Sequence, residues 1–197
     1  MKGIIVSENS TEQKRELVPS GTHVAICYSM IHIGTVEYVY QGETKWSNKV
    51  RLTFELPNEM RDFGGEQKPM VISKEYNLSL HEKSNLRKDI ETWKGVGLTD
   101  KELRSFDITD LIGKECMISI MHKTGASGNE YAAISNVSKM SMGFSCPVQF
   151  NKSFIFNYTD NFNQEWLEEQ PEWIQLQIKG TEEYIAKINQ LKLENEF

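Results

Sequence analysis

Hydrophobic and polar residues alternate most regularly in the segment KVRLTFELP, residues 49–57. Val50, Leu52, Phe54 and Leu56 occupy every second position, which is the pattern of a strand with one buried face. Pro57 predicts the end of this strand, because proline cannot donate a hydrogen bond within a sheet. Residues 58–68 are then expected to form a loop.

Similar reasoning predicts four further strands. Residues 21–34 are rich in apolar and β-branched side chains, and residues 40–48 after them have the composition of a turn. The other three strands are expected at residues 69–80, 116–123 and 130–138.

One helix is strongly marked between the third and fourth strands. Ser84 is a suitable N-cap, Leu86, Ile90 and Trp93 recur at helical spacing, and Gly95 is a typical C-terminal stop. We interpret Lys83, Arg87 and Lys88 as solvated charges paired with Asp89 and Glu91. The segment TDKE at residues 99–102 predicts a capping box for another short helix.

The element order over residues 22–138 is therefore β-β-β-α-β-β. This is the order of the OB-fold, a five-stranded barrel in which the helix closes one end. Leu86, Ile90 and Trp93 are then expected to plug the barrel. The main alternative is a β-sandwich. We predict a mainly β protein with an arm at 1–21, an OB-fold domain at 22–150 and an acidic extension at 151–197 that contains both strand and helix.

Charge is distributed unevenly along the chain. Residues 153–197 contain 3 Lys+Arg and 9 Asp+Glu, so this part carries the whole net charge of −6. The neutral remainder does not indicate a protein that coats DNA generally, but a local basic patch would suffice for binding. No apolar run reaches the ~20 residues of a membrane helix and no signal peptide is recognisable, so we expect a cytoplasmic protein.

Motifs for catalysis or metal binding are not recognisable. Cys27, Cys116 and Cys146 are far apart and are expected to be reduced, and the four histidines lack ligand spacing. Asp107 and Asp110 could be a two-carboxylate magnesium site, although acids are common where a helix begins. We therefore expect no cofactor and no enzymatic activity.

Aromatic and basic residues are interleaved where an OB-fold binds its ligand, on the second strand and the adjacent loops. Such a mixture suits single-stranded nucleic acid, because cations attract phosphates and aromatic rings stack on bases. Each of these residues has an alternative role, in packing or as a solvated charge. The predicted binding residues are Tyr38, Tyr40, Lys45, Trp46, Lys49, Arg51, His122, Lys123 and Tyr131.

The chain also resembles a family of bacteriophage proteins described as single-stranded DNA-binding or replication proteins with an OB-fold. The resemblance covers roughly residues 18–140, is most specific in LSLHEKSNLRKDIETWKG, and includes PEWIQLQIKGTEEY at 171–184. It implies binding of single-stranded DNA, without catalysis, during phage replication or recombination in the host cytoplasm. An adaptor that binds proteins through its acidic segment remains the alternative.

The last residues are similar in kind to the acidic tip of bacterial single-stranded DNA-binding proteins. Glu194, Glu196 and Phe197 place two carboxylates beside a terminal aromatic residue, which suits a basic pocket on a phage or host replication protein. The chain lacks the proline that usually precedes the phenylalanine. The alternative is that Tyr184, Ile188 and Leu191 form the packed face of a final helix that ends in frayed residues.

Overall fold

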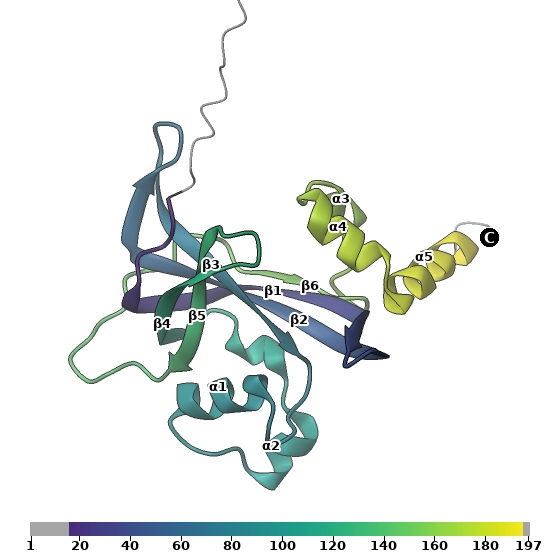
Figure 1. Cartoon of the computed structure of the whole chain (residues 1–197), viewed down its shortest axis with the longest axis horizontal. Helices are drawn as coiled ribbons and strands as arrows, with labels where there is room; N and C mark the ends of the chain where they lie inside the picture. Colours follow the sequence, from purple (N-terminus) through teal and green to yellow (C-terminus); the bar gives the residue numbers. More distant parts are fainter. Residues whose placement is uncertain (1–15, 195–197) are drawn as a thin grey trace, which may run out of the picture.

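The computed structural model describes residues 16–194 and is mainly β (Figure 1). Six strands form one sheet, and five of them follow the order β3-β2-β1-β4-β5 with antiparallel pairing throughout. These five are β1 (Gly21–Tyr40), β2 (Glu43–Asp62), β3 (Gln67–Asn77), β4 (Glu115–Thr124) and β5 (Glu130–Ser138).

The first two strands are longer than predicted. β1 continues to Tyr40 and turns through Gln41 and Gly42, both with positive φ (53° and 80°), as the tightest hairpins require. β2 continues past Pro57 to Asp62, with an irregular register between Leu56 and Met60. The prediction that Pro57 ends the strand is therefore wrong, because proline is tolerated at a bulge.

The predicted order of three strands, a helix and two strands is correct, but the sheet is open. β3 and β5 lie beside each other at its two ends, and no backbone pairing joins them within residues 16–194. Helix α1 (Asn85–Lys94) packs against both strands below this gap. The OB-fold barrel that we predicted is therefore not confirmed, because the sheet does not close.

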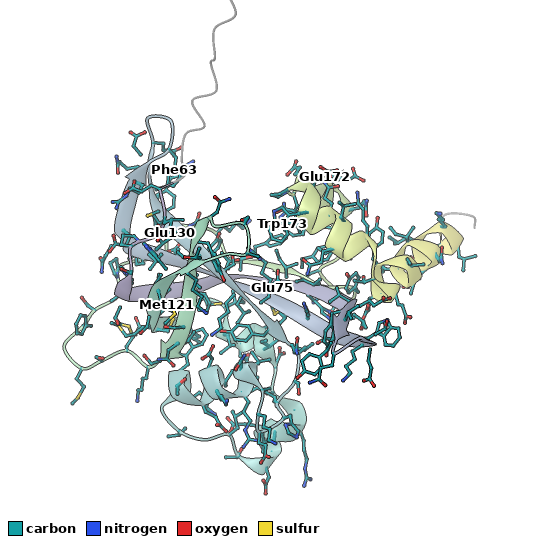
Figure 2. All side chains as sticks on the ribbon, in the orientation of Figure 1. Phe63, Glu75, Met121, Glu130, Glu172 and Trp173 are labelled. Carbon is teal, nitrogen blue, oxygen red and sulfur yellow. The ribbon has the colours of Figure 1, made fainter. Side chains whose placement is uncertain are left out.

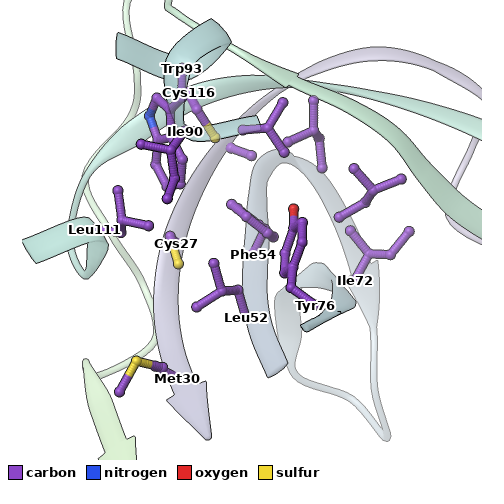
Figure 3. Close-up of a cluster of buried hydrophobic side chains, with 14 of the residues drawn as sticks. Cys27, Met30, Leu52, Phe54, Ile72, Tyr76, Ile90, Trp93, Leu111 and Cys116 are labelled. Carbon is purple, nitrogen blue, oxygen red and sulfur yellow. The ribbon is translucent and has the colours of Figure 1, made fainter. Parts of the chain in front are cut away.

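Helix α1 is anchored in the main hydrophobic core, as predicted (Figure 3). Trp93 lies 5.8 Å from the ring of Phe54, and its indole N–H donates to the carbonyl of Glu115 at 2.8 Å. Ser84 and Gly95 cap the helix as expected. Two short helices follow, α2 (Asp100–Ser105), which has the predicted capping box, and the 3-10 helix η1 (Ile108–Leu111).

One charge on α1 is not solvated. Asp89 is buried and accepts hydrogen bonds of 2.7 Å from both the hydroxyl of Tyr76 and the ammonium of Lys74. Burial, followed by the charge of Asp89, raises the pKa of Tyr76 well above its usual value. Our interpretation of Asp89 as a surface charge is wrong, because a partner on β3 stabilises it inside the protein.

The C-terminal unit, residues 151–194, packs on β1 and does not trail from the sheet (Figure 1). β6 (Phe154–Phe156) pairs in parallel with Ser29–Ile31 of β1, next to the part of β1 that pairs with β4. A second hydrophobic cluster joins Ile31 and Ile33 to side chains of the helices. The helices are α3 (Gln164–Glu168), α4 (Glu172–Lys179) and α5 (Glu182–Glu194).

The start of α5 approaches the backbone of β1 at Gly34. A Cβ atom at Gly34 would lie 2.9 Å from Oε2 of Glu183, so only glycine leaves room for this contact. The carboxylate of Glu183 accepts the backbone N–H of Thr35 at 2.9 Å and its hydroxyl at 2.7 Å. Glu183 thereby satisfies the backbone N–H of Thr35, which lies past the residues of β1 that pair with β6.

Acid is expected to weaken this junction. Partial burial acts to raise the pKa of Glu183, but the hydrogen bonds from Thr35 outweigh it and lower the pKa from 4.5. A lowered folded-state pKa contributes stability above the unfolded value that is lost as the pH falls through the folded value. The free energy of unfolding of Glu183→Gln should therefore lie below that of the native protein near neutral pH, and the gap should narrow below 4.5.

Urea denaturation at a series of pH values from about 7 downward past 4.5 checks this prediction, because the stability of a group with a lowered pKa is lost over that range. Glu182→Gln is the matched control, since it removes the same charge from an exposed neighbouring position. A gap for Glu183→Gln that is independent of pH would contradict the prediction.

Candidate nucleic-acid interface

The exposed end of the β1–β2 ribbon contains a set of aromatic and basic side chains on one face. Tyr38 lies opposite Lys45, and Tyr40 lies opposite Glu43. Residues directly opposite in an antiparallel pair share a face, as do alternate residues along a strand. One face of the ribbon, which we call the tyrosine–lysine face, therefore contains Tyr38, Tyr40, Lys45, Lys49 and Arg51.

The tip of this face is accessible. The side chains of Tyr38 and Tyr40 are 37% and 53% exposed. The ammonium of Lys45 lies 5.0 Å from the ring centroid of Tyr40 and 3.4 Å from the carboxylate of Glu43. Lys49 forms no ion pair with any residue between 16 and 194. A phosphate and a base could thus be held side by side here.

Trp46 lies on the opposite face of the ribbon. It pairs with Glu37 in the register and is 62% exposed. Its neighbours on that face of β2 are Asn48 and Val50, which lead toward the main core. The structure therefore does not bring Trp46 together with Tyr38, Tyr40 and Lys45.

Arg51 differs from Lys45 because its ion pair is less exposed and joins it to another strand. Its guanidinium donates to Glu75 of β3 at 3.0 Å. The indole ring of Trp173, from α4, lies over the same guanidinium with its centroid 4.9 Å away. Trp173 and Glu75 are labelled in Figure 2. The contact between Arg51 and Trp173 is a site feature that the sequence did not reveal.

The β4–β5 hairpin contributes the other predicted residues. Lys123 lies opposite Tyr131 and shares a face with it, whereas His122 lies opposite Ala132 on the other face. The ring of His122 donates to the carbonyl of Val18 at 2.8 Å, so it fastens the chain before β1. The strand pairing places this hairpin beyond the start of β1. Tyr38 and Tyr40 lie at the opposite end of β1.

The predicted partner-binding tip is only partly described. Glu194 is the last residue of α5 and is exposed. Glu196 and Phe197 lie outside the described residues. Tyr184 contacts the second cluster and its ring centroid lies 6.3 Å from that of Phe162, which agrees with a docked final helix.

Asp107, one of the two acids considered for a metal site, has a structural role. Asp107 accepts the hydroxyl and the backbone N–H of Thr109, and these bonds lower its pKa and begin η1. Within residues 16–194, no group of three or more His, Cys, Asp or Glu side chains could hold a metal ion. The helices in the same range are all too short or too polar to span a membrane.

Comparison of the chain with models of protein families finds no match, and comparison with curated proteins finds none either. A proposal for the function therefore rests on the geometry of the sheet and on the chemistry of its exposed faces.

Proposed function

We propose that the protein binds single-stranded DNA without catalysis, on the tyrosine–lysine face, as an OB-fold module of phage replication or recombination. The register carries this proposal, because it gathers two exposed tyrosines and two lysines on one face of an extended ribbon. Cations that attract phosphates and rings that stack on bases are the two requirements for binding single strands.

The arrangement of the sheet supports the OB-fold part of the proposal. OB-folds are partly open five-stranded barrels, and their nucleic acids bind on the face of strands two and three and its adjoining loops. Here the two end strands, β3 and β5, lie beside each other, and α1 packs against both. The lysines and Arg51 of the tyrosine–lysine face belong to β2, and its tyrosines belong to the paired end of β1. The face thus includes the second strand, one of the two strands on which OB-folds bind oligonucleotides.

Binding to labelled oligothymidine, followed by fluorescence anisotropy, tests the proposal. Affinity should fall between 50 mM and 200 mM salt, because bound phosphates release counterions, and single strands should bind more tightly than duplex. Tyr40→Ala should weaken binding by about 1–3 kcal/mol, the contribution of one base–aromatic stack. Lys45→Gln should reduce the dependence on salt by about one phosphate contact.

Trp46→Ala is the matched control, because it removes an exposed aromatic residue of the same ribbon from the other face. We expect its affinity to remain within about threefold of the native value. Equal binding of duplex and single strand, or no effect of Tyr40→Ala and Lys45→Gln, would refute the proposal.

A protein-binding adaptor is the second candidate, and the surface of the C-terminal unit favours it. Leu176, Ile185 and Leu193 are each more than half exposed among acidic residues of α4 and α5. Such a mixture suits a basic, partly apolar partner. The same oligonucleotide titration separates the two functions, because an adaptor of this kind would not bind DNA.

A further inference from the structure

Helix α4 stands beside the tyrosine–lysine face and directs an aromatic ring at it. Trp173 lies over Arg51, which belongs to that face, and half of the Trp173 side chain remains exposed. Trp173 is absent from the second hydrophobic cluster, although its neighbour Ile174 is buried there. Its packing is therefore directed at the sheet face and not at the core of the C-terminal unit.

The position of this ring is fixed from two directions. Ile174 and Ile178 hold α4 in the cluster that includes Ile31 and Ile33 of β1. Glu75 pairs with Arg51 and holds the guanidinium on which the indole rests. A planar guanidinium stacks well on an aromatic ring. Little conformational entropy remains to be lost when a ligand covers the free side of the indole.

Charge differs between the two sides of this site. The exposed acids of α3 and the start of α4 are Glu165, Glu168, Glu169 and Glu172. Lys45 and Lys49 lie on the ribbon itself. A strand bound between them is most stable with its phosphates toward the lysines and its bases toward the helix.

We infer that Trp173 stacks on a base of the bound strand, so that the C-terminal unit forms one wall of the binding site. This inference rests on the proposed function. Arg51 lies eight positions after Glu43, the residue opposite Tyr40, which corresponds to about 26 Å of strand. That length equals about eight nucleotides at the stacked spacing of one strand. At that spacing an oligonucleotide of four nucleotides covers only about half of the distance between Tyr40 and Trp173.

Oligonucleotide length makes the inference testable in the full-length protein. Trp173→Ala should weaken binding of a twelve-nucleotide oligothymidine at least about fivefold, the lower end of one base–aromatic stack. It should change binding of a four-nucleotide oligothymidine much less, because that ligand can occupy the ribbon alone. Leu176→Ala is the matched control, since it shortens an exposed apolar side chain one turn further along α4.

Tryptophan fluorescence provides a second readout that does not depend on replacing Trp173 with alanine. In a Trp46→Phe background the twelve-nucleotide ligand should quench emission, and the further change Trp173→Phe should abolish most of that quenching. The remaining indoles belong to Trp93, which is buried, and Trp166, which packs on Phe154 and Phe156.

The outcomes separate this inference from the proposed function. If Tyr40→Ala weakens binding while Trp173→Ala binds both lengths normally, the proposed function stands and the wall formed by α4 is refuted. Quenching that persists in the Trp173→Phe protein refutes it as well, even where Trp173→Ala is unstable. If the native protein binds neither oligonucleotide, both proposals fail.

Discussion

Replacing Trp93 with alanine is expected to lower the free energy of unfolding by about 3–5 kcal/mol, the usual cost of removing a large aromatic side chain from a core. Trp93 joins α1 to Phe54 of β2, and its N–H satisfies the carbonyl of Glu115 at the start of β4. The change would leave a cavity beneath the gap between β3 and β5 and a carbonyl without its partner. Urea denaturation followed by circular dichroism measures the loss.

Two variants make the Trp93 result specific. Trp46→Ala removes the same kind of side chain from an exposed position and should alter stability by no more than about 0.5 kcal/mol. Trp93→Phe retains most of the apolar contact but not the hydrogen bond, so it should lie between the native protein and Trp93→Ala. A Trp93→Ala protein as stable as the native one would show that α1 does not plug the sheet.

Replacing Glu55 with glutamine is expected to destabilise the protein by on the order of 3 kcal/mol, because hydrogen bonds to a buried charge are strong and costly to lose. Glu55 is fully buried on β2. Its carboxylate accepts three hydrogen bonds of 2.8 Å, from the backbone N–H of Phe150 and from the backbone and side-chain N–H groups of Asn151. A glutamine amide would direct its own N–H groups at one of these donors.

Hydrogen exchange provides a local measurement of the Glu55 prediction. The amides of Phe150 and Asn151 should exchange faster in Glu55→Gln than in the native protein, because their acceptor is weakened. Glu43→Gln, at an exposed position of the same strand, is the control and should leave both amides unchanged. Unchanged exchange in Glu55→Gln would mean that the carboxylate does not hold this segment.

Local signals were sufficient for much of the fold. The alternation through residues 49–57 correctly predicted that Val50, Leu52, Phe54 and Leu56 are buried, because a strand with one covered face has a period of two. The helix between Ser84 and Gly95 was equally clear, since its caps and its apolar stripe lie within twelve residues of one another.

The features that the sequence did not reveal depend on distant segments. Glu55 follows the polar alternation of its strand, but a segment about a hundred residues later covers it and donates to its carboxylate. In the sequence Asp89 resembles a surface charge, and only the fold places the hydroxyl of Tyr76 beside it. Neither neighbour leaves a local pattern from which it could be inferred.

The candidate site shows the same limit. The sequence placed Tyr38, Tyr40, Lys45 and Trp46 in one segment, but only the hairpin register decides which of them share a face. The sequence also did not reveal that His122 donates to the carbonyl of Val18. Trp173 and Arg51 are far apart in sequence, so no spacing could have joined them.

The two-sided burial of β1 affects how the chain folds as it is made. Ile31 and Ile33 leave the ribosome early, but Ile174 and Ile178 of the same cluster are synthesised more than a hundred residues later. At 5–20 residues per second the delay is roughly 7–30 s. During that time β1 exposes an apolar face that the rest of the sheet cannot cover. We therefore expect the nascent chain to aggregate more readily than the finished protein.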